Sequence, residues 1–103
     1  MPDRAAVTQC VYAVIDELND ELAAEARIAK SLDTPLVGRA GKLDSLGVVS
    51  LMFSLERAVE DDLKTEITLS DRLLQTEGDD PLATVGRLID FVTQLVEERR
   101  RAA

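Results

Sequence analysis

The stretch VGRLIDFVTQLV, residues 85–96, carries the clearest structural signal in the chain. Its apolar residues recur at the three- and four-residue steps that place side chains on one face of an α-helix. They are Val85, Leu88, Ile89, Val92, Leu95 and Val96. We therefore predict a last helix that follows Pro81, is capped by Thr84 and ends in the basic run Arg99–Arg101, which opposes the negative end of the helix dipole.

Two earlier segments repeat this pattern. The first helix is predicted over residues 7–22, with a possible extension through residue 28, and its apolar residues are Val7, Val11, Val14, Leu18 and Leu22. The second is predicted to start at Asp44 and to end at the acidic pair Asp61–Asp62, and its apolar residues are Val48, Leu51, Met52, Leu55 and Val59. The side chain of Asp44 or Ser45 can cap this second helix.

Turn-forming residues separate these segments. Asp33, Thr34, Pro35 and Gly38 break the first helical pattern, so we expect a loop over residues 31–43 with Leu36 and Val37 anchoring it on the core. A short third helix is predicted from Ser70 to a point before Gly78, with Leu73 and Leu74 as its apolar residues. No alternating β-pattern, repeat or linker is present, which predicts a single all-α domain over residues 1–103, a four-helix bundle of three main helices and one short one.

The composition constrains the core and the partners. Hydrophobic residues make up 46% of the chain but aromatic residues only 3%, so we expect an aliphatic core with Tyr12, Phe53 and Phe91 as its few large rings. A formal net charge of -8 opposes binding to the phosphates of nucleic acid and favours basic protein partners and a monomeric state.

The chain lacks the side chain that enzymes use most often as a general base. The chain has no histidine, which removes the commonest general base and metal ligand, and no serine triad can be assembled around Ser45. The acidic pairs Asp61–Asp62 and Asp79–Asp80 do not match the twelve-residue calcium loop of an EF-hand. Together with the missing histidine, this leads us to predict no catalytic residue and no metal site. Cys10 lies among Val7, Val11 and Val14 in the helical pattern and is expected to be a small core residue.

No segment is apolar over the ~18 residues that a membrane span requires. The first residues, Met1–Arg4, lack the apolar region of a signal peptide. From these patterns we expect a cytoplasmic protein without a membrane span.

The start of the second predicted helix resembles the acyl carrier protein family. The matching stretch is GKLDSLGVVSLM, residues 41–52, with the triplet Asp44-Ser45-Leu46 at a helix start after a long polar loop. Weaker similarity extends through Glu56, residues 65–67 and the Thr84–Val85 helix start. The order of the helices and the acidic charge also suit this family.

The resemblance implies a noncatalytic carrier. Ser45 matches the serine to which a phosphopantetheinyl transferase attaches 4'-phosphopantetheine from coenzyme A, with Asp44 and Leu46 beside it. The arm would hold acyl groups as thioesters for acyl-transferring, ligase or synthase enzymes with basic docking patches, in fatty acid, lipid or polyketide-type biosynthesis. Expected contacts with the partner or the acyl chain are Val48, Val49, Met52, Phe53 and Glu56. For Val48, Met52, Phe53 and Leu55 the alternative, a plain core position, is favoured.

The chain departs from the carriers of primary fatty acid synthesis, in which the residue after the triplet and others along the second helix are typically acidic. Here Gly47 and Ser50 stand there, and the acids come later, at Glu56, Glu60, Asp61 and Asp62. Because surface charge selects partners, this favours a specialised carrier. Two alternatives are an aminoacyl or peptidyl carrier, and an unmodified helical module whose acidic surface binds a basic partner.

Overall fold

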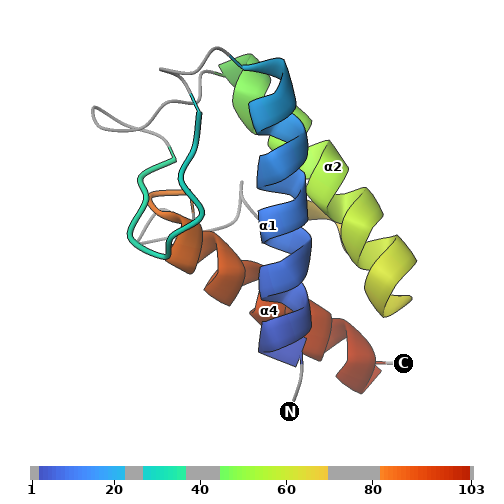
Figure 1. Ribbon diagram of the computed structural model, residues 1–103. Helices are drawn as coiled ribbons and strands as arrows, with labels where there is room; N and C mark the ends of the chain where they lie inside the picture. The colour runs from blue at the N-terminus through green and yellow to red at the C-terminus, as the bar shows by residue number, and fades with distance from the viewer. Residues whose placement is uncertain (1–2, 23–26, 37–44, 70–81, 103) are drawn as a thin grey trace.

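The computed structural model describes residues 3–22, 27–36, 45–69 and 82–102. Within these ranges the chain forms three helices. They are α1 (Asp3–Glu21), α2 (Ser45–Leu63) and α4 (Val85–Ala102). α1 packs against both other helices, with α2 running roughly antiparallel beside it and α4 crossing near its N-terminal half (Figure 1). The described residues thus form an all-helical bundle, and the short helix predicted from Ser70 lies outside them.

The core is aliphatic, as the composition predicts. Its buried residues are Val7, Cys10, Val11, Val14, Ile15, Leu18, Ile28, Leu36, Leu51, Leu55, Val59, Leu69, Leu82, Val85, Leu88, Ile89, Val92, Leu95 and Val96. Tyr12 and Phe91 pack against its edge, but Phe53 is 68% exposed. The expectation that Phe53 is a core ring is therefore wrong, because this residue lies on the outward face of α2.

α1 begins at Asp3 and ends at Glu21, so the proposed extension through Ile28 is also wrong. The side chain of Asn19 accepts a hydrogen bond from the Ile28 amide at 2.7 Å and donates one to the Ile28 carbonyl at 2.8 Å. This pair satisfies both backbone groups of Ile28 without a helix and holds its buried side chain against the core.

The loop before α2 supplies the cap of α4. The Val85 amide donates to the Thr34 carbonyl and the Gly86 amide to the Leu32 carbonyl, both at 2.9 Å. The Arg87 amide donates to the Thr84 hydroxyl at 3.2 Å, which confirms Thr84 as the capping residue. The first three amides of the helix therefore have acceptors in the protein.

The close contact of the loop with α4 depends on a small residue. A Cβ atom on Gly86 would lie 3.0 Å from the Leu32 carbonyl oxygen. Leu36, the next apolar residue of the loop, is fully buried, as its anchoring role predicts, whereas Val37 lies outside the described residues.

The C-terminal end of α2 is held by the arginine run of α4. Lys64 follows the helix with a φ of 54°, the left-handed conformation that commonly ends helices. Arg100 donates to the Leu63 carbonyl at 3.3 Å and to the Thr65 hydroxyl at 3.4 Å. The basic run thus places a positive charge at the negative end of α2 as well as at the end of its own helix.

Candidate functional site

Ser45 is the first residue of α2, one residue after the start that the sequence pattern predicts at Asp44. The first turn of a helix presents backbone amides that lack an acceptor within the helix, together with the positive end of the helix dipole. The segment that begins at Ser45 therefore favours a negatively charged group electrostatically. Asp44, the other candidate cap, lies outside the described residues.

α2 carries apolar side chains on two faces. On the inward face, Leu51, Leu55 and Val59 are completely buried. On the outward face, Leu46, Val49 and Phe53 are 74%, 41% and 68% exposed. Steps of three and four residues place these three side chains in one row, which we call the apolar ridge.

The remaining predicted contact residues lie at the edges of these two faces. Val48 and Met52 are half-buried and pack against the core. Leu55, which the sequence left open between a core position and an acyl-chain site, is a core residue. The predicted site residues on α2 are thus divided between the ridge and the side that packs on the bundle.

Glu56 has a role within the fold that sequence reasoning missed. Its carboxylate accepts a hydrogen bond of 2.7 Å from the Leu69 amide, thirteen residues along the chain. The bond fixes the segment after α2 and lies beside the buried Leu69 side chain. No spacing rule relates a helical glutamate to a backbone amide at this separation, so the sequence contained no usable signal for it.

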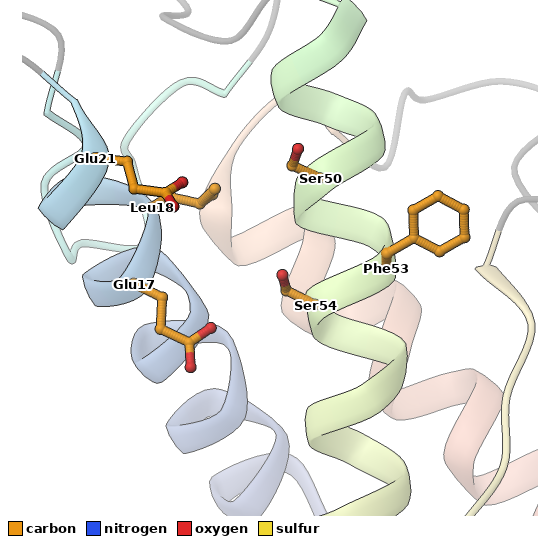
Figure 2. Close-up of a pocket in the computed structure, with 6 residues that line it drawn as sticks. All are labelled: Glu17, Leu18, Glu21, Ser50, Phe53 and Ser54. Atoms are coloured by element: carbon orange, nitrogen blue, oxygen red, sulfur yellow. The ribbon is translucent and has the colours of Figure 1, made fainter.

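A groove of about 310 Å³ runs between α1 and α2. Its lining residues are Glu17, Leu18, Glu21, Ser50, Phe53 and Ser54. Figure 2 shows both glutamates on α1 and both serines directed from α2 toward α1, whereas the ring of Phe53 points away from the gap. The groove therefore combines carboxylate and hydroxyl groups with apolar surface, and the ring of Phe53 belongs to the apolar ridge on the neighbouring face of α2.

Cys10 lies on the buried face of α1, with 2% of its surface exposed. Its Sγ is 3.6 Å from an Asp62 carboxylate oxygen and 3.9 Å from the Ala58 carbonyl oxygen. Burial, together with the charge and hydrogen bond of Asp62, raises the pKa of the thiol from 9.0 to about 11. Cys10 is thus a protonated core residue, as predicted, and not a nucleophile at neutral pH.

The described residues were also compared with what a metal site and a membrane span require; neither is found there. No group of three or more Cys, Asp or Glu side chains there is placed to hold a metal ion. None of the three described helices is both long enough and apolar enough to cross a membrane.

No family model, curated protein or solved structure matches this chain. The function of the site therefore has to be inferred from its own residues.

Proposed function

We propose that this protein is a noncatalytic carrier that holds acyl groups as thioesters on a 4'-phosphopantetheine arm attached to Ser45. The observation that carries the proposal is the position of Ser45 at the first residue of α2, directly before the apolar ridge. The Asp44-Ser45-Leu46 triplet, which resembles that of acyl carrier proteins, supports it independently.

The residues around Ser45 fit such a group. An attached phosphodiester carries a negative charge, which the N-terminal end of α2 would stabilise by up to about 1 kcal/mol at an exposed position. Leu46, the next residue, is 74% exposed, so the helix start is open to a modifying enzyme on that side. Phosphopantetheine supplies the thiol that forms the thioester, so the buried Cys10 and the absence of histidine are compatible with the function.

The chain's own residues would present the arm and select its partners. Attachment joins the Ser45 oxygen to the phosphorus of the phosphopantetheine phosphate, and the nucleotide part of coenzyme A leaves. Leu46, Val49 and Phe53 then offer apolar surface to the transferase and to the acyl-transferring, ligase or synthase enzymes that follow. Such a carrier would act as a monomer in the cytoplasm, and its departures from the usual charge pattern favour a specialised pathway.

Two other functions use the same surface. An aminoacyl or peptidyl carrier would need the same serine and differ only in its cargo. An unmodified interaction module is favoured by the apolar ridge itself, because exposed apolar side chains in a row mark binding surfaces whether or not a cofactor is attached.

The test is the intact mass of the protein after incubation with coenzyme A and a broad-specificity phosphopantetheinyl transferase. We expect the wild-type chain and Ser50→Ala, which changes another serine of α2, to gain one phosphopantetheinyl group. Ser45→Ala should gain none. No gain on the wild-type chain, with a transferase that modifies a reference carrier in the same reaction, would favour the unmodified module.

A further inference from the structure

A segment without helix, residues 27–36, runs from the C-terminal end of α1 to the N-terminal end of α4 (Figure 1). At the α1 end, the Asn19 side chain holds both backbone groups of Ile28, at 2.7 and 2.8 Å. Lys30 also pairs with Asp16 of α1 at 3.1 Å, but an exposed ion pair of this kind adds little stability. The pair of bonds between Asn19 and Ile28 is therefore the main polar contact of the segment with α1.

At the other end, three backbone hydrogen bonds join the segment to the start of α4. The Leu36 amide donates to the Ala83 carbonyl at 3.2 Å, the Val85 amide to the Thr34 carbonyl at 2.9 Å and the Gly86 amide to the Leu32 carbonyl at 2.9 Å. Within the segment, the Thr34 amide donates to the Ser31 carbonyl at 3.1 Å, which closes a turn around Leu32. The three bonds to α4 share one register, so a shift of the turn affects all of them.

The segment itself is largely exposed. Its buried side chains are Ile28 and Leu36, one near each end, whereas residues 29–33 are all exposed. Segments with few buried side chains and exposed backbone hydrogen bonds open at a lower free energy than the packed helices around them. Opening of residues 27–36 therefore does not require α1, α2 or α4 to unfold.

We propose that residues 27–36 form a latch that opens and closes as one unit between α1 and α4 while the helices stay folded. Its two ends are coupled because each restrains the chain for the other, so that once one end is released, closing the other costs more chain entropy. Opening removes the acceptors of the Val85 and Gly86 amides and uncovers Ile28 and Leu36. The latch uses only these contacts and does not depend on the proposed function.

Gly86 determines how closely the latch fits against α4. A Cβ atom there would lie 3.0 Å from the Leu32 carbonyl oxygen and 3.4 Å from the Leu32 Cβ, so an alanine pushes Leu32 away from the helix. Alanine is also a better helix former than glycine. Gly86→Ala should therefore loosen the latch without destabilising α4, which separates opening of the latch from unfolding of the helix.

The test is hydrogen exchange of the backbone amides in the folded, unmodified protein, followed by NMR. In the wild type, the Ile28 and Gly86 amides should open with one equilibrium constant, larger than that of the Leu55 amide in the centre of α2. Gly86→Ala should raise the opening constant at Ile28 on the order of tenfold, although the hydrogen-bond partner of Ile28 lies on α1. The opening constant at Leu55 should change by less than about twofold.

The reciprocal variant acts from the α1 end. Asn19→Ala removes both partners of Ile28 and should raise the opening constant at the Gly86 amide on the order of tenfold. Asp20→Ala on α1 and Gln94→Ala on α4 are the matched controls, because they change exposed side chains outside the latch. Each control should alter the opening constants at Ile28 and Gly86 by less than about twofold.

Two results would overturn the latch. If exchange became faster only at the end that carries the substitution, the two ends would be independent contacts. If the Leu55 amide accelerated as much as those of Ile28 and Gly86, the helices would open together with the segment.

Discussion

Leu51, Leu55 and Val59 on one face of α2 are completely buried, whereas Leu46, Val49 and Phe53 on another face are 41–74% exposed. Both rows are apolar and both follow the spacing of one helix, so hydrophobicity and periodicity do not distinguish them. What distinguishes them is contact, since α1 and the rest of the core cover only the inward row. Folding explains why the inward row is apolar, because these side chains form the core. The ridge is not explained by the core, and exposed apolar side chains in a row commonly mark a binding surface.

The largest expected loss of stability comes from truncating a buried side chain of the inward row. Leu55→Ala should lower the free energy of unfolding by about 2–5 kcal/mol, because it removes buried methyl groups and leaves a cavity in a close-packed core. Urea denaturation followed by circular dichroism measures the change. A loss below about 1 kcal/mol would mean that this part of the core readily repacks. The two faces of α2 would then differ less in their contribution to stability than their burial indicates.

A smaller loss is expected at the boundary between the faces. Glu56→Ala leaves the Leu69 amide without its acceptor and should lower the free energy of unfolding by about 1–3 kcal/mol. Glu60→Ala, an exposed position one turn later, should stay within about 0.5 kcal/mol. Faster hydrogen exchange at the Leu69 amide in the first variant alone would locate the cause.

If Glu56→Ala and Glu60→Ala gave equal stabilities, the bond to Leu69 would contribute nothing. Glu56 would then be available to partners, as the resemblance to carrier proteins suggested.

The stability is expected to depend on pH through Cys10 of α1, which contacts Asp62 of α2. The folded pKa of about 11 exceeds the ordinary value of 9.0, so the folded state holds the thiol proton more tightly. The resulting stability is fully present below pH 9.0 and is lost as the pH rises towards about 11. The difference in unfolding free energy between the wild type and Cys10→Ala should therefore shrink over this interval, whereas a constant difference would contradict the raised pKa.

The sequence predicted those features that depend on local patterns. Three of the four predicted helices, the Thr84 cap, the buried Cys10 and, to within one residue, the start of α2 follow from spacing or from the chemistry of one side chain. Periodicity reports that a face is apolar but not whether another element covers it. For this reason the sequence alone favours a core position for Phe53 over a contact position, whereas its ring lies on the ridge.

Side chains that bond to distant backbone groups were also missed. Asn19 holds Ile28 across nine residues, and Glu56 holds Leu69 across thirteen. Each bond depends on where the chain returns in space, which no local pattern encodes. The groove between α1 and α2 could not be predicted for the same reason, since its two walls come from separate helices whose register is set by packing.

The smallest change in stability, and the most informative comparison, is expected on the ridge. Phe53→Ser removes a ring that is 68% exposed, so the free energy of unfolding should change by less than about 0.5 kcal/mol. The same variant should slow the proposed modification of Ser45 by the transferase, because apolar surface near the proposed attachment site is lost to the partner. A substitution that affects a partner and leaves folding unchanged would separate the two faces of α2 by function as well as by burial. A stability loss comparable with that of Leu55→Ala would instead place Phe53 with the core and remove the basis for the ridge.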